Sequence, residues 1–377
     1  MHDAATMRPG GTLEAPPLRM IAWEVTRACN LDCVHCRAAA FNEPPPGEWT
    51  TEEAYDFLDQ VASFAKPVII LTGGDPMMRE DIWDIASYGT KKGLRMVMSP
   101  NGTLITPETP AKMKESGIMR VSISLDGSNP EIHDAFRRVP GAFEGAVRGI
   151  SILREAGVGY QINTTVTKHN LADLGNMLEL VTDLGAEAWH VFLLVPTGRA
   201  KDMKDEEITP EQYEETLNWL YEVQRDAKIY VKPTCAPHYY RIYRQRARKD
   251  GLPVEPRTQG FEAMTRGCLG GITFMFVSHM GDAYPCGYLE AHAGNVREEG
   301  VEKVWKESPV FNRLRNYALL EGRCGACEYV RVCGGCRARA EAIHGDYMAE
   351  EPYCVYEPKK LQILEAREGQ PHERHGA

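Results

Sequence analysis

Three cysteines near the N-terminus, Cys29, Cys33 and Cys36, have the spacing CxxxCxxC and directly follow a strand-like run at residues 20–26. A [4Fe–4S] cluster normally takes four thiolates, one for each iron. No fourth cysteine lies near these three in the sequence, so one iron would be left without a protein ligand. An open position on a metal can bind a substrate or cofactor. The alternative is a structural zinc site completed by a ligand from elsewhere in the chain.

Most of the remaining cysteines lie in a second group toward the C-terminus. Cys268 is followed by Gly281 and Cys286, and a run with CxxC spacing then contains Cys324, Cys327, Cys333 and Cys336, with Cys354 after it. Of the eleven cysteines, only Cys235 stands apart from both groups. Residues 1–17 lack the apolar core of a secretory signal, so we expect a cytoplasmic protein whose cysteines bind metal rather than form disulfides.

The elements that position these cysteines alternate between strand and helix patterns along residues 19–230. The patterns predict strands at 19–26, 68–72, 95–99, 120–125, 159–166 and 188–194. They predict helices at 51–64, 81–92, 107–116, 143–156, 170–184 and 210–227. Six strand–helix units in succession indicate a parallel sheet with right-handed crossovers. Six units are too few for a full eight-unit barrel, so the fold class is α/β with a partial (β/α)6 barrel.

In barrels of this kind the active site lies at the carboxyl ends of the strands. The first strand ends at the cysteine loop, and the second ends at Gly73, Gly74 and Asp75. Two glycines permit close approach of a ligand to the backbone, although a plain strand-to-helix turn is the alternative. Later strands are followed by polar residues, among them Asn101, Ser124 and Asn163.

The CxxxCxxC loop after a first strand resembles the signature of the radical SAM enzymes. In that family the open iron of the cluster chelates S-adenosylmethionine, which is then split to a 5′-deoxyadenosyl radical. The resemblance implies that Cys29, Cys33 and Cys36 are the catalytic metal ligands. It also implies a cofactor-binding set made of Gly73, Gly74, Asp75, Asn101, Ser124, Arg137, Asn163 and Leu194. Asp75 stands where glutamate is commoner in the family.

The C-terminal cysteines resemble the seven-cysteine SPASM domain of radical SAM enzymes. The resemblance implies two auxiliary [4Fe–4S] clusters, which makes three with the first. One would be bound by Cys324, Cys327, Cys333 and Cys354, and the other by Cys268, Cys286 and Cys336. The fourth ligand of the second set is open between Cys235, another residue and the substrate. The spacing between Cys333 and Cys336 is one residue shorter than usual, and zinc is the alternative metal.

The segment between barrel and cysteines is basic and aromatic in a chain whose net charge is −10. Arg241, Arg244 and Arg248 share a helical face, which a solvated basic helix would also explain. The alternative is a binding surface for a flat ligand with several carboxylates. The expected substrate residues are His238, Tyr239, Arg241 and Arg244 from this segment, together with Arg199, which follows the strand at 188–194. His238 is also a candidate axial ligand of a porphyrin iron.

The negative net charge and the absence of a basic run disfavour nucleic-acid binding, and no apolar stretch is long enough for a transmembrane helix. The expected domains are an N-terminal arm (1–18), the barrel (19–232), the cysteine-rich SPASM domain with its linker (233–356) and a C-terminal tail (357–377), whose last twenty or so residues we expect to be disordered.

The cysteine loop and the block at residues 234–241 resemble the tetrapyrrole-modifying branch of the radical SAM family. That resemblance implies oxidative decarboxylation of two propionates of iron-coproporphyrin III to vinyl groups, with a flavodoxin- or ferredoxin-type electron donor. Two other enzymatic hypotheses are action on another siroheme-derived tetrapyrrole and maturation of a peptide. A non-enzymatic iron–sulfur electron carrier is the remaining hypothesis.

Overall fold

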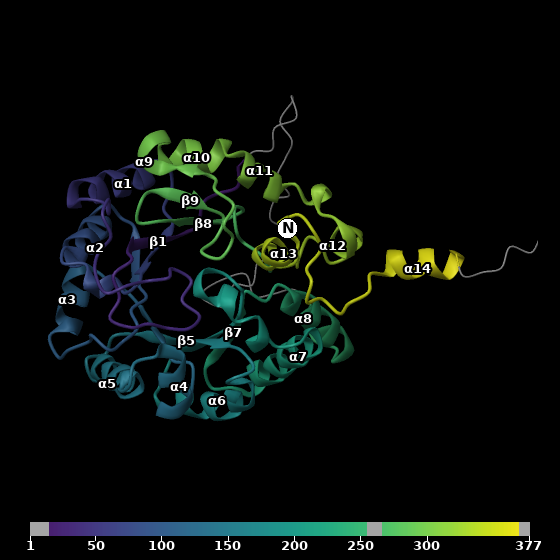
Figure 1. Cartoon of the computed structure of the whole chain (residues 1–377), viewed down its shortest axis with the longest axis horizontal. Coiled ribbons are helices and arrows are strands. Elements are labelled where there is room, and N and C mark those ends of the chain that lie inside the picture. The colour runs from purple at the N-terminus through teal and green to yellow at the C-terminus, as the bar shows by residue number, and fades with distance from the viewer. Residues whose placement is uncertain (1–14, 255–265, 369–377) are drawn as a thin grey trace, which may run out of the picture.

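The core of the computed structural model is a single curved sheet with helices along its outer side (Figure 1). The structure describes residues 15–254 and 266–368. The strand order is β10-β9-β8-β1-β2-β3-β4-β5-β6-β7. Strands β1 to β7 pair in parallel with their neighbours, and β8 pairs in parallel with β1 at the other side. Only the short strands β9 and β10 are antiparallel.

The strands of the parallel series are β1 (Met20–Thr26), β2 (Val68–Gly73), β3 (Arg95–Met98), β4 (Val121–Ser124), β5 (Tyr160–Val166), β6 (Ala188–Leu193) and β7 (Tyr230–Thr234). The C-terminal part adds β8 (Phe274–Val277), β9 (Asp282–Tyr284) and β10 (Gly294–Asn295). Six of these strands were predicted, and the partial barrel is confirmed.

The helices of the barrel are α1 (Thr51–Phe64), α2 (Ile82–Lys91), α3 (Thr109–Ser116), α4 (Pro130–Arg137), α5 (Ala142–Glu155), α6 (Leu174–Asp183) and α7 (Pro210–Asp226). Helix α8 (His238–Lys249) follows β7. Helix α1 begins with a capping box, because Thr50 and Glu53 each bond to the other's backbone N–H. The glycine after α3, Gly117, has a φ of 79°, the left-handed conformation that ends a helix.

Three elements differ from the sequence-based expectation. Strand β7 was not predicted, because its five residues include a lysine and a proline; Pro233 is tolerated at this edge of the sheet. Helix α4 was not predicted either, although Asn129 caps it through its side chain. The stretch at 170–184 begins with a 3-10 turn (Leu171–Asp173) before α6.

The main apolar core lies between the sheet and the helices. Trp23 on β1 is fully buried, and its ring lies 4.8 Å from that of Phe57 on α1 and 5.3 Å from that of Trp49. Because β1 is an interior strand and leads into the cysteine loop, this aromatic packing fixes the point from which the loop leaves the sheet.

The cysteine-rich part is built onto the barrel rather than separate from it. Met20 to Trp23 pair in register with Phe274 to Val277, so β8 extends the barrel sheet beyond β1. The helices of this part are α9 (Val296–Glu299), α10 (Val301–Glu307), α11 (Pro309–Arg315), α12 (Gly322–Ala326), α13 (Arg337–His344) and α14 (Lys359–Glu368). The tail expected to be disordered therefore contains a helix, α14, which projects from the body (Figure 1).

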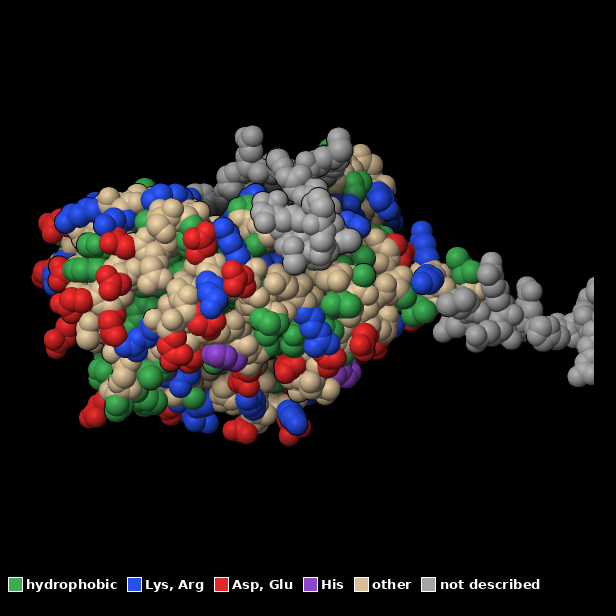
Figure 2. Space-filling view, turned by 90° about the horizontal axis from the view of Figure 1, so that it is seen from above, with side chains coloured by type: hydrophobic (Ala, Val, Ile, Leu, Met, Phe, Trp, Pro, Cys, Tyr) green, Lys and Arg blue, Asp and Glu red, His purple; other side chains and the backbone are tan. Residues whose placement is uncertain are grey.

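Acidic and basic side chains are interspersed on the face in Figure 2. Among the described helices, none is long and apolar enough to cross a membrane. The predicted N-terminal arm lies largely outside the described residues.

Candidate active site and auxiliary cluster sites

The cysteine loop after β1 brings Cys29, Cys33 and Cys36 together at the carboxyl edge of the sheet. The first two are buried, and all three belong to one small packed cluster. Backbone N–H groups of Leu31 and Ala40 donate to the sulfurs of Cys29 and Cys36, each at 3.4 Å. Burial, together with the nearby Asp75 carboxylate and the thiols of Cys33 and Cys36, raises the pKa of the Cys29 thiol to about 12. Such thiols become thiolates when a metal supplies the compensating positive charge, so this donor set fits an iron–sulfur cluster.

Arg137 lies directly beside this loop. Its guanidinium is buried, contacts the Cys33 sulfur at 3.4 Å and forms an ion pair with Asp126. Burial would raise the pKa of Asp126, but the charge of Arg137 and of nearby histidines holds that pKa below its usual range. The positive charge of Arg137 at this position compensates the negative charge of thiolates. The same guanidinium also forms the ion pair with Asp126.

The turn after β2 packs against the cysteine loop. The N–H groups of Gly74 and Asp75 donate to the carbonyls of Thr26 and Ala28, at 2.8 and 2.7 Å. A Cβ on Gly74 would lie 2.3 Å from the Ala28 carbonyl oxygen, so only glycine fits. A Cβ on Gly73 would likewise lie 2.3 Å from the Thr26 carbonyl oxygen, so backbone packing requires both glycines. The sequence alone could not show whether these glycines serve backbone packing or the approach of a ligand.

Asp75 is fully buried and links this turn to the end of β3. Its carboxylate accepts N–H bonds from Met77 and Asn101, at 2.8 and 2.7 Å. Burial raises its pKa to about 6, although both bonds oppose the rise. The side chain of Asn101 in turn donates to Asn30 in the cysteine loop at 2.7 Å. Asp75 and Asn101 thus form a continuous polar connection to the loop.

The other expected cofactor residues lie along the same edge of the sheet. Ser124 ends β4, and Asn163 on β5 pairs in register with it. The Asn163 side chain accepts a hydrogen bond from Gln161 at 3.0 Å. Leu194 follows β6 and is buried, with its carbonyl accepting a bond from Arg339 at 2.9 Å.

Arg199, one of the expected substrate residues, binds the backbone of the cysteine loop. Its Nε donates to the carbonyl of Cys33 at 2.9 Å, and its Nη1 donates to the carbonyl of Ala40 at 3.0 Å. Its own N–H donates to the Cys36 carbonyl at 3.0 Å, and its guanidinium pairs with Asp32 at 2.9 Å. Arg199 therefore fastens the cysteine loop, a role that no local pattern indicates because its partners precede it by more than 150 residues.

Replacing Arg199 with methionine is expected to loosen this loop. Losing the two side-chain bonds to loop carbonyls should lower the rate of S-adenosylmethionine cleavage about tenfold, and a chelator should remove iron faster. Both are measured on the anaerobically reconstituted chain. Lys201→Met is the control, since Lys201 pairs with Glu290 at the surface and is expected to behave as wild type. Equal rates and equal iron loss in the two variants would contradict the assignment.

The basic helix α8 does not present the expected surface. Arg241 is buried, forms an ion pair with Glu214 on α7 and donates to Gln245 at 2.8 Å. Tyr239 is also buried, and its hydroxyl donates to Gln224. Arg244 is half-buried and Arg248 is exposed. Arg241 and Tyr239 are thus held by side chains of α7, and the sequence of α8 alone does not identify these partners.

The cysteines expected for one auxiliary cluster line a single cavity. Its lining includes Cys324, Cys327, Cys333 and Cys354, together with His238 and Arg241. Three backbone N–H groups donate to these sulfurs: that of Glu351 to Cys324 at 3.2 Å, that of Tyr329 to Cys327 at 3.4 Å and that of Gly335 to Cys333 at 3.4 Å. Four thiols around one space with donors aimed at the sulfurs fit a [4Fe–4S] cluster.

His238 lies at this cavity rather than at an open surface. It is fully buried, and its Nε2 lies 3.7 Å from a carboxylate oxygen of Glu351. Among the described residues, neither ring nitrogen has a hydrogen-bond partner. Burial lowers the pKa of His238 to about 4, so the imidazole is neutral at pH 7. His238 therefore lies beside the auxiliary cysteines, and its role as an axial ligand of a porphyrin iron stays a prediction.

The remaining expected ligands form a second set. Cys336 is buried in a small apolar cluster, and Cys286 and Cys235 pack against that cluster. Burial, together with the nearby thiols of Cys268 and Cys336, raises the pKa of Cys286 to about 12. In the part of the chain that the structure describes, no three His, Cys, Asp or Glu side chains converge as one ion would require. A tetrahedral zinc ion requires all of its thiolate sulfurs within about 2.3 Å of one metal, whereas in a [4Fe–4S] cluster each thiolate binds a separate iron. The wider spacing of these cysteines therefore favours a cluster.

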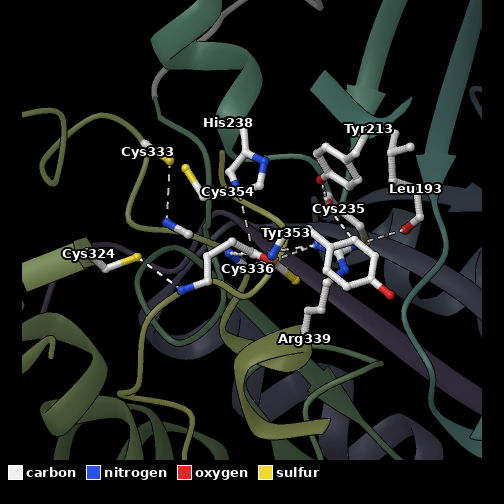
Figure 3. Close-up of polar contacts among 12 residues, drawn as sticks. Leu193, Tyr213, Cys235, His238, Cys324, Cys333, Cys336, Arg339, Tyr353 and Cys354 are labelled. Carbon is white, nitrogen blue, oxygen red and sulfur yellow. Dashed lines mark hydrogen bonds and ion pairs between the residues drawn. The ribbon is translucent and has the colours of Figure 1, made fainter. Parts of the chain in front are cut away.

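A buried ion pair that sequence analysis did not identify separates the two cysteine sets (Figure 3). Arg339 and Glu351 are both fully buried and approach to 3.4 Å. The Glu351 carboxylate accepts the N–H of Cys336 at 2.5 Å, while its own N–H donates to the Cys324 sulfur. Arg339 lies between the rings of Tyr213 and Tyr353, at 5.0 and 5.3 Å. Glu351 therefore contacts ligands of both expected clusters.

His133, on α4, gives the site a predictable pH dependence. Its Nδ1 accepts the N–H of Asp126 at 3.0 Å, and burial lowers its pKa to about 3. The neutral His133 contributes to the free energy of unfolding because its folded-state pKa lies below the ordinary 6.5. This contribution is fully present above pH 6.5 and is lost as the pH falls. Between pH 7 and 5.5 the loss amounts to about 1 kcal/mol.

His133→Asn keeps an acceptor at this position and removes the titration. Thermal unfolding measured anaerobically at pH 7 and 5.5 should therefore show a smaller fall in midpoint for the variant than for wild type. An equal fall in both proteins would show that His133 does not contribute.

The comparisons with known proteins agree with this geometry. Residues 23–181 match the Radical SAM superfamily, and residues 268–337 match the SPASM iron–sulfur cluster-binding domain. The solved structure of Streptococcus suis SuiB bound to S-adenosylmethionine has a TM-score of 0.70 at 17% identity, covering 92% of this chain and 78% of that one. The parallel barrel, the cysteine loop after β1 and these matches define the class: the chain is a radical SAM protein with a SPASM domain.

Two curated relatives place it more closely. The AdoMet-dependent heme synthase of Nitratidesulfovibrio vulgaris (strain Hildenborough) is 53% identical over 96% of this chain and 97% of that protein. The AdoMet-dependent heme synthase of Methanosarcina barkeri (strain Fusaro) is 53% identical over 91% of this chain and 97% of that protein. The chain belongs to the family of AdoMet-dependent heme synthases.

Proposed function

We propose that this chain is an AdoMet-dependent heme synthase that converts two propionates of iron-coproporphyrin III to vinyl groups. The observation that carries the proposal is 53% identity to a heme synthase over nearly the full length of both chains. That extent covers the cysteine loop, the barrel and both auxiliary cysteine sets, so it includes every part of the site described above.

We assign Cys29, Cys33 and Cys36 to the cluster that binds S-adenosylmethionine, which when bound supplies a 5′-deoxyadenosyl radical. The cofactor-contacting set is Gly73, Gly74, Asp75, Asn101, Ser124, Arg137, Asn163 and Leu194, all along the carboxyl edge of the sheet. Within this set Arg137 is the candidate partner of the methionine carboxylate, because a guanidinium beside the cluster favours an anion there. Asp75 and Asn101 hold the loop in position.

The chemistry at each propionate requires removal of one hydrogen atom and one electron. Loss of hydrogen from the carbon next to the ring gives a substrate radical, which becomes a vinyl group when it releases carbon dioxide and one electron. We assign the two auxiliary [4Fe–4S] clusters, bound by the C-terminal cysteines, to accepting that electron. Cys336 is buried, the other six cysteines are partly buried, and Glu351 contacts members of both sets, which suits transfer away from solvent.

The contacts of the five expected substrate residues lead us to propose a smaller set. Arg199 belongs to the cysteine loop, while Tyr239 and Arg241 are held by α7. Of the five residues expected to bind the tetrapyrrole, Arg244 alone is retained as a candidate for a propionate, and His238 is assigned to the auxiliary site. We further propose a flavodoxin- or ferredoxin-type donor for the electron that splits the cofactor, and a cytoplasmic location, because the cysteines are free thiols.

Anaerobic absorption titration of the reconstituted chain with iron-coproporphyrin III tests the substrate class. We expect a Soret shift that saturates at one porphyrin per chain. If the chain acts on a peptide instead, iron-coproporphyrin III should cause no shift, although the clusters are intact and the cofactor is cleaved. That outcome would overturn the tetrapyrrole assignment while leaving the radical chemistry in place.

A further inference from the structure

Cys235 lies at an unusual backbone position at the carboxyl end of β7. Its φ is +54°, which side-chain-bearing residues rarely adopt. Two buried groups hold this turn through the Cys235 carbonyl: the Tyr213 hydroxyl donates to it at 3.0 Å, and the Arg339 guanidinium donates at 3.4 Å. A left-handed non-glycine residue persists only where its surroundings fix it, and such positions cluster at functional sites.

The thiol of Cys235 belongs with the second auxiliary set. Cys235 and Cys286 both pack against the apolar cluster that contains Cys336, and that cluster also includes Val195 and Leu289. Cys336, Cys286 and Cys268 all lie close enough to the Cys235 thiol to interact with it electrostatically. All three expected ligands of this set therefore surround the same thiol. Figure 3 shows the Arg339 side chain extending toward the Cys235 carbonyl, to which it donates.

The surroundings of this set also match a fully coordinated cluster. A [4Fe–4S]²⁺ core bound by four thiolates carries a charge of −2, and a buried anion needs a cation nearby. Arg339 is fully buried, donates to the Cys235 carbonyl at 3.4 Å and lies close enough to the Cys336 and Cys235 thiols to interact with them electrostatically. A free buried cysteine would instead act as a small apolar residue and would not require its backbone to be held in this conformation.

We propose that Cys235 is the fourth ligand of the auxiliary cluster bound by Cys268, Cys286 and Cys336. This inference rests on the proposed function only in taking that set to bind a [4Fe–4S] cluster. It follows that no iron of this cluster is open to the porphyrin carboxylates. The cluster then serves electron transfer, and the substrate is bound by the protein.

The test uses full-length protein in which Cys29, Cys33 and Cys36 are replaced by alanine, so that only the auxiliary clusters remain. Cys235→Ala is introduced into this parent, and Thr234→Ala is the matched control at the same turn. Each protein is reconstituted with iron and sulfide, and the readouts are iron content, Mössbauer and EPR spectra, and the response of those spectra to added imidazole. None of these readouts depends on turnover.

The proposal predicts that the parent and Thr234→Ala hold about eight iron atoms per chain and that their spectra do not respond to imidazole. Cys235→Ala should either lose about four iron atoms or keep them with one iron site that imidazole now binds. Unchanged spectra in Cys235→Ala, or an imidazole response in the parent itself, would overturn it. Where Cys235→Ala does not fold, the parent still tests the proposal, because an imidazole response in the parent would show an open iron and overturn it. If the wild-type chain forms no heme while these spectra are as predicted, the proposed function alone is refuted.

Discussion

Cys33→Ala is expected to abolish cleavage of S-adenosylmethionine and to lower the iron content by about four atoms per chain. Cys33 is the central cysteine of the loop, it is buried, and its sulfur contacts Arg137. With two thiolates left, the first cluster cannot be held at the edge of the barrel, and no radical can be generated there. The measurements are iron analysis and the amount of 5′-deoxyadenosine released under anaerobic reducing conditions.

Val34→Ala is the control for this substitution, because it changes the next residue without removing a ligand. The N–H of Val34 donates to the Phe136 carbonyl at 2.9 Å, and this backbone bond is kept in the variant. We expect its iron content and cofactor cleavage to remain close to wild type. Full cofactor cleavage by Cys33→Ala would contradict the assignment of the loop as the site of radical formation.

Glu351→Gln is expected to destabilise the fold by about 3–5 kcal/mol, because it leaves the fully buried Arg339 without its charged partner. Glu351 also accepts the N–H of Cys336, so the loss should extend to the auxiliary clusters. Anaerobic denaturant unfolding gives the free energy, and the iron content gives the second readout. Glu302→Gln is the matched control, since its pair with Lys306 is half-exposed and should contribute less than about 1 kcal/mol.

The double variant Glu351→Gln/Arg339→Met separates pairing from packing. Removing both charges should recover part of the stability lost in Glu351→Gln, because the uncompensated buried cation is gone. If the double variant is less stable than the single one by the full cost of Arg339→Met, the two residues act independently and the buried ion pair is not what joins the cysteine sets.

The parts of this fold with strong local signals could be predicted from sequence. Helix α1 begins and ends at the predicted residues because Thr50 and Glu53 form a cap and its apolar residues recur at helical spacing. Cysteine spacing identified two groups of thiols, and the structure brings the members of each expected set together. The short edge strand β7 was missed because it lacks an apolar run and contains Pro233.

The side-chain roles that were missed all depend on partners distant in sequence. The arginines of α8 form a regular basic face in the sequence, yet Arg241 is neutralised by Glu214 on the preceding helix. Arg199 contacts the cysteine loop across the barrel, and Arg339 contacts the end of β6. A single sequence shows that a charge is present but not which charge faces it, so contacts of this kind follow only from the fold.

Turnover of iron-coproporphyrin III is the measurement that tests the central claim most directly. The reconstituted chain is incubated anaerobically with iron-coproporphyrin III, S-adenosylmethionine and a reductant, and porphyrins, carbon dioxide and 5′-deoxyadenosine are quantified. The account predicts heme b, with two carbon dioxide and two 5′-deoxyadenosine molecules for each one formed, and none in Cys33→Ala. Cofactor cleavage by a fully clustered chain without carbon dioxide or a vinyl product would contradict it.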